Sequence, residues 1–334
     1  MCIRDRGKPD SYYNAIINWV KQRYDLVVAK EMINFVPGIV PGIGMAMNCF
    51  TQKGDKVMIQ PPVYHPFAWV TTRNERTLVT NPLKWENGMY RMDLDTFREQ
   101  IKGCKLFILC NPHNPGGVVW TEAELRAIAD ICYDEKVLVF SDEIHADLTL
   151  PPHTHRPFAT VSEKARMNSV TFMSPSKAFN MPGLSASHAL IFNEDLRKRF
   201  RIYMDAGELD MGHVFAFLSV EAAYSHGTEW LDQCLAYIQG NIDFVDDFLK
   251  NHAPKIKAIR PEASYLVWLD CRELKLSQKD LNEFFVDKAH LALNDGEMFG
   301  KEGIGFMRLN VASPRCIIEK AMKQLADAYQ LYIK

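Results

Sequence analysis

Short runs of apolar residues alternate with longer amphipathic stretches through the first two thirds of the chain. The runs are apolar at nearly every position, a pattern typical of strands that are buried on both faces of a parallel sheet. They lie at residues 106–110, 137–140, 170–173 and 189–192, and further strands are predicted at 56–60 and 76–83. A helix with a capping box at Thr121 and Glu124 fills one of the intervals. This order predicts an α/β fold with a mostly parallel, doubly wound sheet flanked by helices.

The pattern changes after a long helical stretch at residues 229–249. Strands are predicted at residues 265–269, 291–293 and 306–310, with helices between them, so we expect a smaller α+β domain here. The last helix is predicted to start at Ser313-Pro314, an N-cap followed by proline at the first helical position. Its expected buried positions are Ile317, Ala321, Leu325 and Ala328.

These patterns divide the chain into three parts. We expect an N-terminal segment at residues 1–29, a large domain at 30–235 and a small C-terminal domain at 236–334. Residues 9–22 of the first part have the spacing of an amphipathic helix. Residues 1–6 show no signal-peptide pattern and do not lead naturally into that helix, so we expect them to be an artefact of cloning or assembly.

Composition excludes several classes of protein. Of 334 residues, 47% are hydrophobic and 24% are charged, with a formal net charge of -2. That charge gives no reason to expect nucleic acid or an anionic membrane as a partner, and no apolar run approaches the length of a membrane helix. The eight cysteines are scattered without the spacing of a metal site or a disulfide scaffold, so we expect reduced thiols, no bound metal and a cytoplasmic location.

Polar side chains follow four of the predicted strands. Carboxyl ends of parallel strands meet at one edge of a sheet, so these side chains can share one crevice. The residues are Tyr64, Asn114, Asp142 and Lys177.

Each of these residues also has a plain structural interpretation. Lys177 can form an imine with an aldehyde cofactor, with Ser174 and Ser176 beside its phosphate, or it can be a surface lysine in a loop. Tyr64 can plug the edge of the core, and Asp142 can cap a loop. The Asn114–Pro115 bond is predicted to be cis, because it lies in a tight, specified turn.

Two further stretches carry polar candidates. The Pro-Gly turns before a helix predicted at residues 43–50 leave N–H groups that can bind an anion, or they form a simple connection between loop and helix. Glu143 follows a buried strand, and we interpret it as one half of a structural salt bridge. His145 is most often a packed loop histidine.

Four motifs together resemble one family. They are PHNPGG, SDEIH, SPSKAFN and FMRLNVASPR, and the similarity covers Gly7 to the end of the chain. The set resembles the pyridoxal-phosphate-dependent class I and II aminotransferase superfamily of fold type I, and within it the cystathionine β-lyase (carbon–sulfur lyase) branch.

The resemblance implies a cofactor, pyridoxal 5'-phosphate, and a role for each candidate. Lys177 would hold the cofactor and move the substrate's Cα proton, and Asp142 would pair with the pyridinium nitrogen. Arg308, whose alternative is a surface salt bridge, would grip the substrate carboxylate in a bidentate fork. The remaining cofactor contacts would come from Asn114 at the phenolic oxygen, Tyr64 on the ring face, the backbone N–H groups of Gly42 and Ile43 with Ser174 and Ser176 at the phosphate, and His145 nearby. Tyr64 would also be catalytic, because its hydroxyl would orient groups near the imine.

The reaction implied by the resemblance is β-elimination on cystathionine or cysteine-type amino acids, which gives a thiol, pyruvate and ammonia. Transamination uses the same lysine, and a non-catalytic regulatory protein of the same fold is a further alternative. His145 favours elimination, since similar aminotransferases more often carry tyrosine there. The resemblance also implies a homodimer, and relatives begin some tens of residues earlier with an arm that reaches the partner's cofactor.

Overall fold

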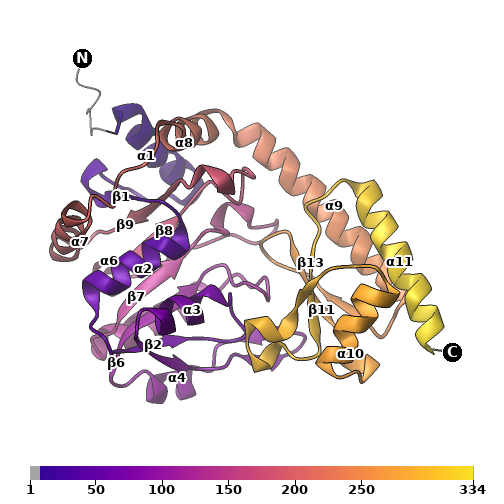
Figure 1. Cartoon of the computed structure of the whole chain (residues 1–334). Helices are drawn as coiled ribbons and strands as arrows, with labels where there is room; N and C mark the ends of the chain where they lie inside the picture. The colour runs from indigo at the N-terminus through magenta and orange to yellow at the C-terminus, as the bar shows by residue number, and fades with distance from the viewer. Residues whose placement is uncertain (1–7, 334) are drawn as a thin grey trace.

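Residues 8–333 are described by a computed structural model, and residues 1–6 lie outside them. A seven-stranded sheet forms the centre of the larger part of the molecule, with strand order β1-β9-β8-β7-β6-β2-β3 (Figure 1). Its strands are β1 (Ile33–Val36), β2 (Lys56–Ile59), β3 (Thr77–Thr80), β6 (Cys104–Cys110), β7 (Leu138–Asp142), β8 (Ser169–Met173) and β9 (Ser187–Leu190). Neighbours from β3 to β8 pair in parallel, while β9 is antiparallel to both β8 and β1, so the predicted fold class is confirmed.

Helices cover both faces of this sheet. Successive side chains of a strand point to opposite faces, so Ile108 of β6 packs in the cluster of α2 and α3, and Phe107 packs in that of α4 and α5. Burial on both faces is the reason that these strands are apolar at most positions. The helices are α2 (Ile39–Phe50), α3 (Pro66–Arg73), α4 (Leu94–Gln100), α5 (Glu122–Asp134), α6 (Glu163–Met167) and α7 (Glu194–Ala206).

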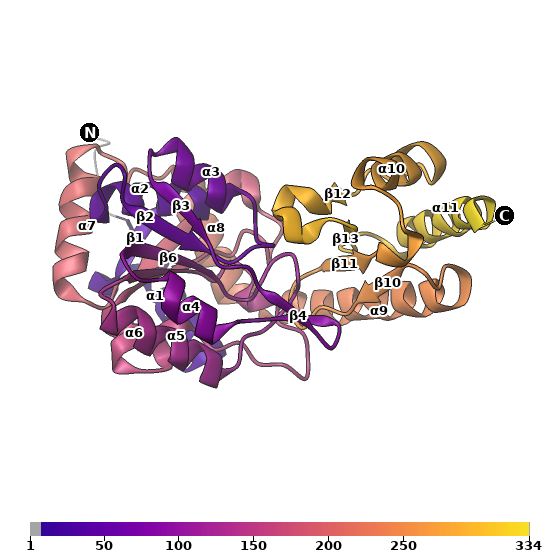
Figure 2. The ribbon, with the colours of Figure 1, turned by 90° about the horizontal axis from the view of Figure 1, so that it is seen from below.

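A second, four-stranded antiparallel sheet with order β10-β11-β13-β12 forms the smaller part (Figure 2). Its strands are β10 (Lys257–Ile259), β11 (Leu266–Asp270), β12 (Asn294–Asp295) and β13 (Phe306–Asn310). Helices α9 (Thr228–His252), α10 (Gln278–Glu283) and α11 (Arg315–Ile333) share a core with it. The predicted boundary between residues 235 and 236 falls inside α9 and stays a prediction.

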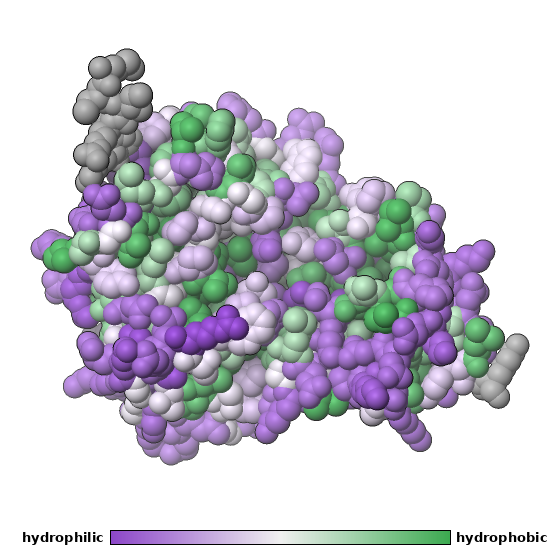
Figure 3. Space-filling view, in the orientation of Figure 1, coloured by the Kyte–Doolittle hydropathy of each residue, from purple (hydrophilic) through white to green (hydrophobic). Residues whose placement is uncertain are grey.

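The remaining elements complete the larger part. Helix α1 (Asp10–Tyr24) packs against α8 (Val214–His226), with Trp19 stacked on Tyr224 at 4.7 Å between ring centroids. Strands β4 (Lys84–Glu86) and β5 (Met89–Arg91) form a hairpin. Within residues 8–333, no helix combines the length and the apolar character that crossing a bilayer requires. Hydrophilic side chains gather over the elements around α10 (Figure 3).

Several expected details are wrong. The strand expected at residues 291–293 lies three residues later, at β12. In α11, Ile317 is half exposed and Ile318 is buried in its place, while Leu325 and Ala328 are buried as expected. The capping box at Thr121 and the cis Asn114–Pro115 bond are confirmed.

Candidate active site

The carboxyl ends of the parallel strands open into a cavity of about 490 Å³ that β13 of the small sheet closes from the opposite side. Asn114 follows β6, Asp142 ends β7, and Lys177 follows β8. Seven of the residues predicted from the sequence line this cavity together: Tyr64, Asn114, Asp142, His145, Ser176, Lys177 and Arg308. The expected convergence of strand ends is therefore present in the structure.

Asp142 is a carboxylate almost removed from water. The residue is 4% exposed, and its Oδ1 accepts one hydrogen bond, from the Ile144 N–H at 3.0 Å. Burial raises the pKa of the Asp142 carboxyl to about 7, with a smaller contribution from the negative charge of Glu143. An acid in this environment needs a cationic partner to stay ionised.

The turn that carries Lys177 is held by hydroxyl groups. Ser174 Oγ lies 2.7 Å from the Ala186 carbonyl oxygen and 2.9 Å from Ser176 Oγ, and it accepts the N–H of Ser176 at 3.1 Å. Ser176 lines the cavity, but Ser174 does not. Ser174 therefore orients Ser176 in this structure, and its contact with a phosphate stays a prediction.

Arg308 reaches across the cavity from the small sheet. Its Nη1 donates to Asn114 Oδ1 and its Nη2 donates to Asn294 Oδ1, both at 2.8 Å. Its guanidinium also lies 4.6 Å from the centre of the Phe299 ring. Burial lowers the pKa of Arg308 to about 10, so the group remains a cation at neutral pH. The Arg308–Asn114 bond leaves the Asn114 amide nitrogen available as a donor.

His145 and Tyr64 also face the cavity. Burial lowers the pKa of His145 to about 3, assisted by the positive charges of Lys177 and Arg308, so its imidazole is neutral. Its Nδ1 is buried without a hydrogen-bond partner among residues 8–333. Burial raises the pKa of the Tyr64 phenol, which therefore carries its proton.

The prediction that the Gly42 and Ile43 N–H groups bind an anion is wrong. Helix α2 begins at Ile39 rather than at residue 43, and the Gly42 N–H donates to the Gly38 carbonyl oxygen at 2.9 Å. Ile43 is fully buried in the second turn, and neither residue lines the cavity. Ile39 and Val40 line it instead, and N–H groups in the first turn of a helix have no intrahelical acceptor.

Sequence reasoning missed other residues of the cavity wall. Asn294 lies directly opposite Arg308 in the pairing of β12 with β13, so it orients the guanidinium. A correct placement of β12 would have identified it as a cross-strand neighbour. No signal in the sequence distinguished the others from ordinary loop or strand residues, among them Cys110, Tyr265 and Asn310.

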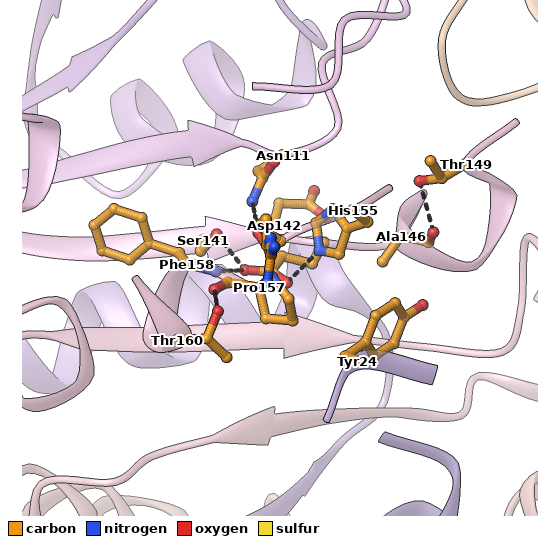
Figure 4. Close-up of polar contacts among 12 residues, drawn as sticks. Tyr24, Asn111, Ser141, Asp142, Ala146, Thr149, His155, Pro157, Phe158 and Thr160 are labelled. Carbon is orange, nitrogen blue, oxygen red and sulfur yellow. Dashed lines mark hydrogen bonds and ion pairs between the residues drawn. The ribbon is translucent and has the colours of Figure 1, made fainter. Parts of the chain in front are cut away.

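The interpretation of Glu143 as one half of a structural salt bridge agrees with its contact to His155. Its Oε2 lies 2.8 Å from His155 Nε2, and both side chains are almost fully buried. Figure 4 shows His155 beside Asp142, at the end of β7. Glu143 does not line the cavity.

Comparisons with known proteins agree with this geometry. The family described as aminotransferase class I and II matches residues 7–325. Cystathionine beta-lyase PatB of Bacillus subtilis (strain 168) is 38% identical over 317 residues, which are 94% of this chain and 82% of that protein. Cystalysin from Treponema denticola, whose crystal structure contains a pyridoxal 5'-phosphate cofactor, aligns with a TM-score of 0.95 at 34% identity, over 98% of this chain and 84% of that one.

More distant relatives carry a different activity in their names. An aspartate aminotransferase of Pyrococcus horikoshii is 22% identical over 320 residues, which are 95% of this chain and 80% of that protein. The family match spans nearly the whole chain and includes every residue of the cavity wall. This chain therefore belongs to the aminotransferase class I and II family.

Proposed function

We propose that this chain is a pyridoxal-phosphate-dependent carbon–sulfur β-lyase. Its substrates are cystathionine or cysteine-type amino acids, and its products are a thiol, pyruvate and ammonia. The observation that carries the proposal is the convergence of Lys177, Asp142 and Arg308 on one cavity. An amine, a buried acid and a guanidinium are the groups that this cofactor and an amino-acid substrate require.

The residues of the cavity fit the cofactor. The Asp142 carboxylate, buried with a single N–H partner, suits a pyridinium nitrogen, and the free amide donor of Asn114 suits the phenolic oxygen. Tyr64 offers a ring face. The first turn of α2 at Ile39 and Val40, together with Ser176, suits the phosphate.

The chain's own groups then perform the proton transfers. When bound, the cofactor withdraws electrons from the substrate's Cα. The Lys177 amine takes the Cα proton, and the electron pair of that C–H bond expels the Cβ substituent as a thiolate. The released 2-aminoacrylate tautomerises and hydrolyses in water to pyruvate and ammonia. Arg308 holds the substrate carboxylate so that the Cα–H bond faces Lys177.

Elimination is preferred to transamination because of the relatives' names and His145. A relative at 38% identity is named a cystathionine β-lyase, whereas an aspartate aminotransferase matches at 22%. The third alternative, a non-catalytic regulatory protein, is disfavoured by the presence of Lys177, Asp142 and Arg308 in one cavity.

The proposal includes a homodimer in the cytoplasm. Helix α8 begins with exposed apolar side chains at Val214, Phe215 and Leu218, which a second copy of the chain would cover. The free cysteines suit a reducing compartment. Sedimentation velocity would test the oligomeric state.

The reaction itself is tested by incubating the purified chain and pyridoxal phosphate with cystathionine or cysteine. We expect pyruvate without any added 2-oxoacid, measured through a coupled dehydrogenase. Product formation that depends strictly on a 2-oxoacid acceptor would refute elimination. Failure to form a borohydride-reducible chromophore would favour the non-catalytic alternative.

A further inference from the structure

The segment that follows β7 presents its side chains in two directions. Asp142 and His145 line the cavity, while Glu143 points to the opposite side and is excluded from the cavity wall. The Glu143 N–H donates to the Phe172 carbonyl oxygen at 2.9 Å, and the Asn111 N–H donates to that of Asp142 at 2.9 Å. The backbone at Asp142 is thus tied to the neighbouring strands on both sides.

The Glu143 side chain adds connections to a more distant loop. Its Oε1 accepts the Ser141 hydroxyl and the Phe158 N–H, both at 2.8 Å, and its Oε2 lies 2.8 Å from His155 Nε2. We call these four residues the Glu143 cluster. The Glu143 side chain is 0% exposed and that of His155 is 1% exposed, so solvent cannot replace either partner.

The cluster joins two parts of the chain next to Asp142 (Figure 4). One part is the end of β7, with Ser141 and Asp142. The other is the loop that carries His155 and Phe158, which Asn111 also holds through its Nδ2 bond to the Arg156 carbonyl oxygen at 3.1 Å. A carboxylate with three donors is a strong, directional connection.

We propose that Glu143 and His155 are positioning residues, which hold the Asp142 carboxylate in the orientation that the cofactor nitrogen requires. This inference rests on the proposed function, because it assigns a task to Asp142. Within residues 8–333, the Asp142 carboxylate accepts a single hydrogen bond, from the Ile144 N–H, so its own contacts do not determine its direction. Second-layer contacts of this kind commonly fix the geometry of a functional group.

The chemistry of the pair indicates which substitutions are informative. In Glu143→Gln, the amide nitrogen would face His155 Nε2, which would then have to accept and carry its proton on Nδ1. That Nδ1 has no partner within residues 8–333, so the exchange leaves a buried donor unsatisfied. His155→Phe removes the donor completely, whereas the amide of His155→Gln can still donate to Glu143.

A control variant should lose a buried hydrogen bond far from the cavity. Thr51 fits, because its hydroxyl donates to the Met47 carbonyl oxygen at 2.7 Å and accepts from Arg76 Nε at 2.9 Å. It follows the last residue of α2, a 12-residue helix, and therefore lies about 18 Å from the helix end that faces the cavity. Thr51→Val keeps the shape of the side chain and removes both hydrogen bonds.

The test compares two quantities for each variant: the dissociation constant of pyridoxal phosphate, by absorbance titration, and the unfolding temperature of the cofactor-free chain. We expect Glu143→Gln and His155→Phe to weaken cofactor binding about tenfold, the effect of one lost hydrogen bond to a charged group. Thr51→Val should lower the unfolding temperature without this loss of affinity. His155→Gln should retain most of the wild-type affinity for the cofactor. With saturating cofactor, the first two variants should lower kcat and leave KM for cysteine unchanged.

The outcomes separate the two proposals. If the wild-type chain forms no chromophore with pyridoxal phosphate, the proposed function fails. If the wild type binds the cofactor and the cluster variants bind it equally well, or if their affinity falls only as much as that of Thr51→Val, the positioning role is overturned.

Discussion

Replacing Asp142 with asparagine should stabilise the cofactor-free chain at alkaline pH. Burial raises the pKa of the Asp142 carboxyl from its ordinary 3.8 to about 7, because the folded protein disfavours the charged form. The asparagine side chain would have the same shape and could still accept the Ile144 N–H, but it never ionises. Each pKa unit corresponds to about 1.36 kcal/mol, so the whole penalty of ionisation is about 4 kcal/mol at pH 8.

The direction in which the free energy of unfolding changes with pH follows from proton binding. The folded chain holds the Asp142 proton more tightly than the unfolded chain, so this stabilising contribution is complete below 3.8 and is lost as the pH rises through about 7. Between pH 5 and pH 8 the wild type should lose about 3 kcal/mol that Asp142→Asn keeps. Other charges near Asp142, among them Glu143 and Lys177, are present in both proteins and largely cancel in the difference.

The assay is urea unfolding of both cofactor-free proteins at several values between pH 5 and pH 8. The free energy of unfolding of Asp142→Asn should exceed that of the wild type by an amount that grows with pH. A constant difference would show that Asp142 does not titrate in this window, and the reasoning from burial would be wrong. Adding cofactor should narrow the difference at pH 8, because a ligand at 100 times its dissociation constant stabilises the folded state that binds it by about 2.7 kcal/mol.

Four further substitutions test the site and the fold. Lys177→Ala should abolish the borohydride-reducible chromophore, which is measured by its absorbance after mixing with pyridoxal phosphate. Arg308→Ala should keep the chromophore and raise KM about 100-fold, as expected for two lost hydrogen bonds to a charged group; an unchanged KM would exclude Arg308 as the carboxylate ligand. Gly117→Ala should lower the free energy of unfolding by about 3 kcal/mol or more, because the new Cβ would lie 2.5 Å from that of Pro261 at a φ of +69°. Gly103→Ala, at a φ of +76° with open space around it, should cost only about 1 kcal/mol, and equal losses for the two would contradict the steric argument.

The strands of the large sheet could be predicted because their burial requires consecutive apolar residues, and such runs are easily recognised in the sequence. Both faces of β6 are covered, so each of Leu106, Phe107 and Ile108 must be apolar. The strand ends then follow directly, and with them the convergence of Asn114 and Asp142. A site built on the edge of a parallel sheet is therefore accessible to sequence reasoning.

The error at the start of α2 has a specific cause. Two Pro-Gly steps favour a turn, so the sequence pattern predicts a helix that begins after Gly42. Proline is tolerated in the first turn of a helix, where its missing N–H has no acceptor to lose, and Pro41 occupies that turn. The helix therefore begins at Ile39, and the unpaired N–H groups lie on other residues than those predicted.

The error at β12 hid a partner of Arg308. The strand has two residues, and its neighbours Leu291 and Leu293 gave a stronger apolar signal than Asn294 itself. A strand this short is defined by its pairing with β13 rather than by its own pattern. Cross-strand pairing depends on segments distant in sequence, so the Asn294–Arg308 contact could not be inferred from either segment alone.

Desolvation connects the stability of this chain with its choice of ligand. It is the largest cause of the displaced pKa of Asp142, His145 and Arg308 alike. Within residues 8–333 of the free chain, no cation is hydrogen-bonded to Asp142, and Arg308 donates only to neutral amides. A ligand gains the full benefit of these groups only if it brings a cation to Asp142 and an anion to Arg308, as a ring nitrogen and an amino-acid carboxylate do. His145 remains neutral and does not compete for that carboxylate. Burial of these groups therefore both destabilises the free protein and determines which charges its ligand must carry.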